Sequence, residues 1–173
     1  NRLNPDFYIL NGHEPVYLFD ASIYIFRAWF GYPDHFYDAQ DRPVNAVYGY
    51  LRYLLPRLQQ IDPVYMVAAF DESLFSGFRH QLYPSYKANR ALADEDLAYQ
   101  LKLCQQLTAK LGLRCLVHPM YEADDLLALV ARIGVQQTRP LVVVSRDKDL
   151  MQLVGPQDQF WDWSAETKMS YQQ

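Results

Sequence analysis

Hydrophobic residues occur along the chain in short runs, separated by stretches with helical spacing. Four runs have the length and apolar content of a buried strand, and a fifth is suited to the edge of a sheet. The four runs cover residues 16–20, 64–70, 114–118 and 140–145, and the fifth covers residues 159–163. Because strands alternate with helices, the pattern predicts an α/β fold, a three-layer sandwich with a mostly parallel central sheet.

The expected helices cover residues 22–30, 43–60, 95–111 and 122–133, with a short helix over residues 147–154. Pro43 is suited to the first turn of the second helix, and Pro56 predicts a kink within it. Asp94 is a suitable N-cap for the third helix. Gly112 follows that helix at a typical C-cap position.

The chain has 173 residues, half of them apolar, which suits one domain with a sizeable core. We expect residues 1–15 to be an irregular lead-in and residues 16–173 to form a single domain. The first residue is Asn1 rather than Met, which indicates a trimmed or processed chain. Neither a signal peptide nor a membrane-spanning run is found, and the two cysteines suit reduced core thiols, so a cytoplasmic location without membrane contact is expected.

Seven carboxylates fall where predicted strands end. Asp20 closes the first strand and Asp71 follows the second; Glu122, Asp124 and Asp125 follow the third; Asp147 and Asp149 follow the fourth. The carboxyl ends of parallel strands meet at one edge of a sheet, so these acids are expected to lie together. The net charge of −4 argues against a general basic nucleic-acid surface, but less so if the acids hold cations.

Each acid, taken singly, is adequately explained as a helix cap or the start of a turn. Together they are not, because close carboxylates repel one another, and only Arg146 and Lys148 lie beside them as counter-charges. Oxygen ligands without clustered His or Cys favour magnesium, for which manganese can substitute. Seven acids suit two ions, the arrangement used for in-line phosphoryl displacement.

A segment rich in basic and aromatic residues follows Asp71. It contains Phe78, Arg79, His80, Tyr83, Tyr86, Lys87 and Arg90. Lys and Arg side chains bind phosphates, and aromatic rings stack on bases. A solvated surface loop explains the composition equally well, but the position directly after Asp71 favours nucleic-acid binding.

Four motifs, in order and at matching intervals, resemble those of the 5′-nuclease superfamily. This superfamily includes the 5′→3′ exonuclease domain of bacterial DNA polymerase I, stand-alone bacterial exonucleases and flap endonucleases. The motifs are Leu18-Phe19-Asp20-Ala21-Ser22 with Arg27, Phe70-Asp71 with Phe78-Arg79 and Tyr86-Lys87-Ala88-Asn89-Arg90, Glu122-Ala123-Asp124-Asp125, and Ser145-Arg146-Asp147-Lys148-Asp149-Leu150. The resemblance covers residues 16 to 154 and implies a PIN-like fold that cleaves DNA at 5′ ends or flaps.

The resemblance also implies a role for each matched residue. The first metal would be held by Asp20, Asp71, Glu122 and Asp124, and the second by Asp125, Asp147 and Asp149. Lys87 and Arg90 would steady the scissile phosphate, and Asp124 would act with them in catalysis. Tyr86 would stack on the terminal base, with Arg27 and Arg79 as weaker candidates for phosphate contact.

The sequence departs from the family pattern in two respects. The helix-three-turn-helix part that grips duplex DNA, and the acids near it that complete the second metal site, are absent from this chain. Arg146 stands where family members often have Gly. Two alternatives stay open, a PIN-type ribonuclease and a non-catalytic module that binds DNA ends or flaps. An α/β phosphatase is disfavoured, because Ser22 stands where a second Asp is expected.

Overall fold

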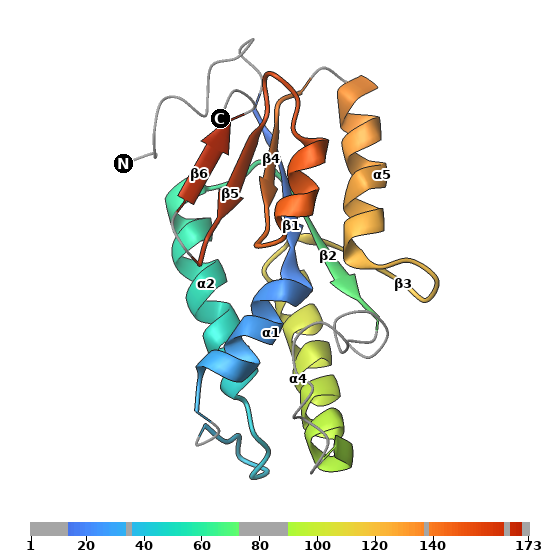
Figure 1. Cartoon of the computed structure of the whole chain (residues 1–173). Helices are drawn as coiled ribbons and strands as arrows, with labels where there is room; N and C mark the ends of the chain where they lie inside the picture. Colours follow the sequence, from blue (N-terminus) through green and yellow to red (C-terminus); the bar gives the residue numbers. More distant parts are fainter. Residues whose placement is uncertain (1–13, 34–35, 73–89, 137–138, 165–166, 171–173) are drawn as a thin grey trace.

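A computed structural model describes residues 14–33, 36–72, 90–136, 139–164 and 167–170 (Figure 1). Its elements, in chain order, are β1 (Val16–Asp20), α1 (Ala21–Gly31), α2 (Asn45–Ile61), β2 (Tyr65–Asp71), α4 (Arg90–Lys110), β3 (Arg114–His118), α5 (Ala123–Gln136), β4 (Leu141–Val144), the 3-10 helix η3 (Lys148–Leu153), β5 (Gln159–Asp162) and β6 (Thr167–Ser170). No helix among these residues is both long and apolar enough to cross a membrane.

The strands form one six-stranded sheet in the order β3-β2-β1-β4-β5-β6. The first five are parallel to their neighbours, and β6 pairs antiparallel with β5. The chain therefore adds strands on one side of β1 and later returns to the other side. Ligands of open α/β sheets bind at such a reversal, outside the carboxyl ends of the strands.

Helices cover both faces of the sheet, as the sequence predicted (Figure 1). On one face, α1, α2 and α4 pack over a core that includes Phe19, Tyr50 and Trp161. On the other face, α5 and η3 pack over a core that includes Leu18 and Leu127. Phe19 and Leu18 point to opposite faces because side chains alternate along a strand. The predicted α/β sandwich with a mostly parallel sheet is confirmed.

Several predicted boundaries are wrong. α4 begins at Arg90, so Asp94 lies inside the helix and is not its N-cap; the intervening Ala and Leu residues are strong helix formers. The expected last strand, residues 159–163, is followed by β6, whose short polar sequence gives no apolar signal. Gly112 does end α4, with φ of 90° and a backbone hydrogen bond to Ala109.

The start of α2 also differs from the prediction. Pro43 forms an isolated β-bridge with Tyr37, and the helix begins at Asn45. Gln100 of α4 supplies the cap, because its Oε1 accepts hydrogen bonds from the backbone N–H groups of Ala46 (2.6 Å) and Val47 (3.1 Å). A capping residue more than fifty positions away cannot be recognised from local sequence. The helix continues through Pro56.

Gly49 allows α1 and α2 to approach closely. A Cβ atom at this position would lie 2.6 Å from Ala28 Cβ and 2.5 Å from a ring carbon of Tyr32. We therefore expect Gly49→Ala to lower the free energy of unfolding by about 1–3 kcal/mol in chemical denaturation, despite the better helix propensity of Ala. Gly31→Ala is the matched control, because nothing lies within 4 Å of its added methyl group; equal losses in both variants would contradict the packing argument.

Candidate functional site

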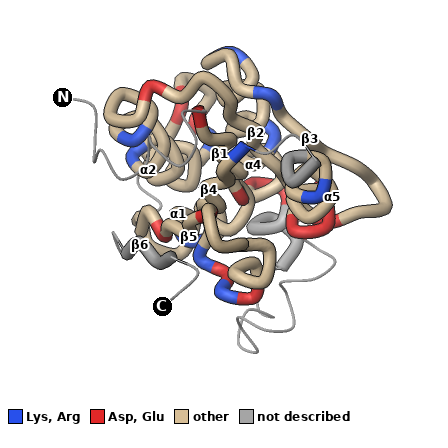
Figure 2. Tube along the Cα trace, turned by 90° about the horizontal axis from the view of Figure 1, so that it is seen from above, with Lys and Arg blue, Asp and Glu red and all other residues tan. Residues whose placement is uncertain are grey.

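Two buried acids mark the edge of the sheet where the strand order reverses. Asp20 is the last residue of β1 and Asp71 the last of β2, and each is only 5% exposed. The start of α5 follows β3 at the same edge, and η3 follows β4 there. Figure 2, which looks roughly along the strands, shows acidic segments beside α5 and towards the middle of the molecule.

Ser145 ties the end of β4 to Asp20. Its hydroxyl donates a 2.7 Å hydrogen bond to Asp20 Oδ2 and accepts a 3.0 Å hydrogen bond from the backbone N–H of Asp147. The serine is fully buried. It therefore fixes the orientation of the Asp20 carboxylate and places Asp147 next to it.

Asp71 is oriented through both its backbone and its side chain. Its N–H donates to the Ser22 hydroxyl (2.8 Å), and its Oδ1 accepts from the backbone N–H of Ala123 (2.7 Å). Its Oδ2 is buried and has no hydrogen-bond partner within the described part of the chain. A buried carboxylate oxygen without a partner is costly, and a cation bound at this edge would satisfy it.

The acids at the helix starts partly serve as caps. Asp125 Oδ2 accepts the backbone N–H of Glu122 at 3.3 Å, and Asp124 Oδ1 accepts that of Asp125 at 2.9 Å. Asp147 caps η3 by accepting the N–H of Asp149 at 2.9 Å. Capping thus explains part of this acidic content, but it does not explain the two buried acids at the strand ends.

Electrostatics shows that the acids interact across the site. Burial, reinforced by the charges of Asp71, Asp124 and Asp147, raises the pKa of Asp20 from 3.8 to about 7, although the Ser145 hydrogen bond opposes the shift. Burial also raises the pKa of Asp71 to about 6, with contributions from the neighbouring acids of α5. Burial and nearby acids raise the pKa of Asp124 as well. Carboxylates that disfavour ionisation together form a strong site for a cation.

The acids lie at one edge of the sheet, but their side chains are not arranged as a complete metal-binding site. Among the described residues, no group of three or more Asp, Glu, His or Cys side chains is arranged so that it could hold a metal ion as it stands. Asp149 is exposed on η3, whereas Asp20 and Asp71 are buried. The donor set nevertheless fits a hard divalent cation, because it consists of carboxylates, one of which has a free buried oxygen.

The predicted nucleic-acid residues are mostly not placed. Arg79, Tyr86 and Lys87 lie outside the described residues. Arg90 is the first residue of α4, and its side chain is likewise not described. Arg27 is exposed on α1. Their expected roles in binding DNA therefore stay predictions.

Sequence reasoning missed the two serines that orient the buried acids. Ser22 follows Asp20 by two positions, and Ser145 comes directly after β4. Both stand inside motifs that the sequence analysis recognised, but only three-dimensional contacts between distant segments reveal their bonds to Asp71 and Asp20. For Ser145, the sequence offered one signal, a polar residue directly after an apolar strand.

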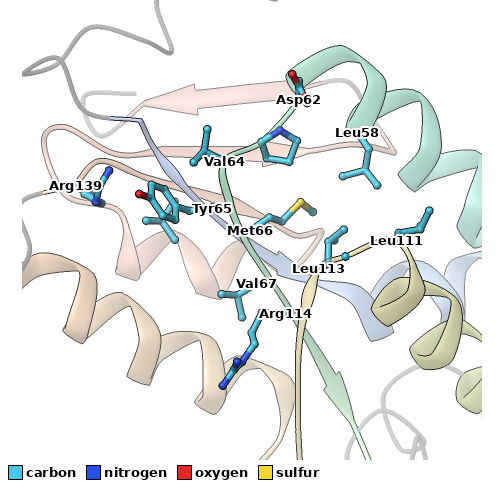
Figure 3. A pocket seen from close by; sticks show the side chains of 13 residues that line it. Leu58, Asp62, Val64, Tyr65, Met66, Val67, Leu111, Leu113, Arg114 and Arg139 are labelled. Carbon is cyan, nitrogen blue, oxygen red and sulfur yellow. The ribbon is translucent and has the colours of Figure 1, made fainter.

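A cavity of about 650 Å³ lies at the opposite edge of the sheet, at the amino ends of the strands (Figure 3). Its lining includes Val64, Met66, Leu111 and Arg139, and Arg139 lies over the ring of Tyr65 at 4.5 Å. The lining is mainly apolar and holds one carboxylate, Asp62, together with Arg114 and Arg139. Several carboxylates gather instead at the acidic edge, which is therefore the candidate site.

Comparison with known proteins identifies relatives of the chain. The family model for the 5′-3′ exonuclease N-terminal, resolvase-like domain matches residues 15–173. DNA polymerase I of Treponema pallidum is 38% identical over 142 residues, which are 82% of this chain and 14% of that protein. A 5′-3′ exonuclease of Aquifex aeolicus is 33% identical over 142 residues, again 82% of this chain but 48% of that protein. The chain thus spans only part of each relative.

Solved structures share the fold. The T5 5′-exonuclease with bound zinc matches with a TM-score of 0.65 and 15% identity, covering 90% of this chain and 58% of that one. The T5 D15 flap endonuclease in complex with DNA and metal ions matches with a TM-score of 0.64 and 14% identity, covering 90% and 57%. At this identity the likeness concerns the fold alone.

Proposed function

The chain belongs to the family of 5′-3′ exonuclease N-terminal, resolvase-like domains, and from this premise we propose that it hydrolyses DNA phosphodiesters with the help of divalent metal ions, as a 5′→3′ exonuclease or flap endonuclease. The observation that carries the proposal is the buried pair of acids at the sheet edge. Within the described part of the chain, Asp71 Oδ2 has no hydrogen-bond partner, and burial raises the pKa of Asp20 to about 7. Only a bound cation lets both acids ionise at neutral pH without a large cost.

We propose that the site takes two magnesium ions, with manganese as a substitute. Asp20, Asp71, Glu122 and Asp124 would hold the first, and Asp125, Asp147 and Asp149 the second. The all-oxygen set supports this choice. Solved structures with the same fold hold divalent zinc in one case and metal ions in another, which supports a metal site in general. Ions held there would supply Lewis-acid chemistry for phosphodiester hydrolysis.

The chain's own residues orient the acids for this task. Ser145 holds Asp20 Oδ2, and the first backbone N–H of α5, that of Ala123, holds Asp71 Oδ1. The other Asp71 oxygen, Oδ2, is buried and has no hydrogen-bond partner among the described residues. Both carboxylates are shielded from bulk water, which strengthens every charge interaction at the edge.

For substrate binding we propose the residues of the basic and aromatic segment. Lys87 and Arg90 would bind the scissile phosphate and Tyr86 the terminal base, with Arg79 and Arg27 as further phosphate contacts. DNA with a 5′ end or flap is the proposed substrate, which agrees with the DNA complex of the T5 D15 flap endonuclease. Lys87→Ala is expected to slow cleavage and to leave the magnesium affinity in a calorimetric titration nearly unchanged.

Cleavage assays with magnesium or manganese test the proposal on three substrates: a duplex with a 5′ flap, a blunt duplex and single-stranded RNA. We expect cleavage of the flap substrate and no activity from Asp124→Ala. Preference for RNA would replace the proposal with a PIN-type ribonuclease. DNA binding without cleavage under either metal would indicate a non-catalytic binding module.

A further inference from the structure

We propose that Arg146 binds a backbone phosphate of the DNA strand, on the β5 side of the acidic edge. The inference rests on the proposed function and extends it, because it adds a cation that the general pattern of the family does not include. It would continue the path of the substrate from the acids across the carboxyl ends of β4 and β5.

The backbone around Arg146 is fixed to the acidic edge. The preceding residue, Ser145, binds Asp20 through its hydroxyl, and its N–H donates to the carbonyl of Trp161 on β5 (3.2 Å). The following residue, Asp147, binds the same hydroxyl. The backbone on both sides of Arg146 is therefore held by hydrogen bonds, which fix the residue between the acids and β5.

Asp162, the last residue of β5, pairs with this arginine and is itself held by hydrogen bonds. Its Oδ1 accepts hydrogen bonds from the Tyr24 hydroxyl (3.3 Å), the Ser164 N–H (2.9 Å) and the Ser164 hydroxyl (2.7 Å). Its Oδ2 lies 4.0 Å from Arg146 Nε. The three hydrogen bonds to Oδ1 hold the Asp162 side chain in place, and Oδ2 faces the guanidinium of Arg146.

The ion pair leaves Nε of Arg146 without a hydrogen bond among the described residues. A separation of 4.0 Å is too long for a hydrogen bond, and Arg146 Nε is buried without a partner within the described residues. The side chain is still 33% exposed, so a ligand can reach it. A guanidinium presents five N–H donors in a planar fork that matches the oxygens of a phosphate.

The ion pair also lies close to the metal-binding acids. Burial raises the pKa of the Tyr24 hydroxyl, and the charges of Asp162 and Asp20 add to the shift. The same hydroxyl donates a hydrogen bond to Asp162. A cation beside Asp162 would offset the repulsion between the phosphates of a bound DNA strand and the carboxylates of the acidic edge.

A purely structural ion pair is the alternative, and the salt dependence of DNA binding separates the two. In EDTA, we expect Arg146→Gln to weaken binding to a 5′-flap DNA and to reduce the slope of log K against log salt by about 0.7–0.9, the loss of one phosphate contact. Arg114→Gln is the matched control. It removes an exposed arginine at the amino end of β3, on the opposite edge of the sheet, and should leave the slope unchanged.

Two further variants exclude effects of folding. Arg146→Lys should restore most of the slope, because it keeps the charge. Asp162→Asn removes the ion pair but keeps the cation, so the wild-type slope should remain. An unchanged slope in Arg146→Gln, or equal losses in Arg146→Gln and Asp162→Asn, would overturn the inference. Wild-type protein that binds DNA with this dependence but does not cleave it would instead refute the proposed nuclease activity and leave the phosphate contact standing.

Discussion

Asp71→Asn is expected to lower the rate of DNA cleavage by at least about a thousandfold and, at the same time, to stabilise the metal-free protein. A thousandfold loss corresponds to about 4 kcal/mol, which is within the several kcal/mol that a bound ion contributes to a phosphoryl-transfer transition state. The amide is a much poorer ligand than the carboxylate for a hard cation. The substitution therefore removes a metal ligand without changing the size of the side chain.

The gain in stability follows from the surroundings of Asp71. The amide carbonyl of Asn can still accept the N–H of Ala123, which Asp71 Oδ1 accepts at 2.7 Å. The charged oxygen without a partner becomes an amide NH2, which suits a site surrounded by carboxylates. Because burial and nearby acids raise the pKa of Asp71 from 3.8 to about 6, we expect the variant to gain about 1–3 kcal/mol of unfolding free energy at pH 8.

Asp158 provides a matched control, since it is also 5% exposed but lies at the other ends of the strands. Its Oδ1 accepts the N–H of Leu141 (2.7 Å) and its Oδ2 that of Gly155 (2.9 Å), so both oxygens are satisfied. Asp158→Asn should lose stability and keep full activity per folded molecule. Urea denaturation in EDTA and single-turnover cleavage measure the two quantities. Destabilisation of both variants to the same degree would show that Asp71 is an ordinary structural acid.

The sequence predicted the fold well because the apolar runs mark the strands. β1, inside the sheet, and β3, at its edge, begin and end where the predicted runs do, and the expected parallel arrangement places the acids on one edge. The weakly apolar β6 and the early start of α4 were missed, since neither has a periodic apolar pattern of its own.

The acids could be found in the sequence because they stand at strand ends and helix starts. The differences in their burial could not be predicted from the sequence. Asp20 and Asp71 are buried, whereas Asp149 is exposed. The difference arises from contacts between segments far apart in the chain, such as the bond between Ser145 and Asp20, 125 positions apart. Local sequence does not encode such contacts, and the same applies to the pairing of Arg146 with Asp162.

The metal-free protein is expected to lose stability as the pH rises from 5 to 8, and magnesium is expected to restore it at pH 8. Below about pH 3, the Asp20 carboxyl is largely protonated in both folded and unfolded chains and has little effect on stability. As the pH rises, the unfolded chain releases the proton at the ordinary pKa of 3.8, whereas the folded chain retains it until about pH 7. Folding therefore becomes progressively less favourable through this window, and the full cost is present above it.

The shift of Asp20 alone corresponds to a loss of about 4 kcal/mol, and Asp71 adds a similar effect in the window from 3.8 to about 6. For a chain of this size, a loss of 4 kcal/mol lowers the melting temperature by roughly 10 °C. Magnesium binds the ionised acids and competes with protons, so it stabilises the fold strongly at pH 8 and little at pH 5.

Thermal unfolding from pH 5 to pH 8, in EDTA and in magnesium, measures both effects, with potassium chloride at equal ionic strength as the control for screening. Asp20→Asn isolates the cause, because it keeps an acceptor for the Ser145 hydroxyl and removes the titrating group. Its melting temperature in EDTA should vary much less with pH than that of the wild type. A metal-free wild type that became more stable between pH 5 and pH 8 would show that the buried acids are not the dominant titrating groups of this fold.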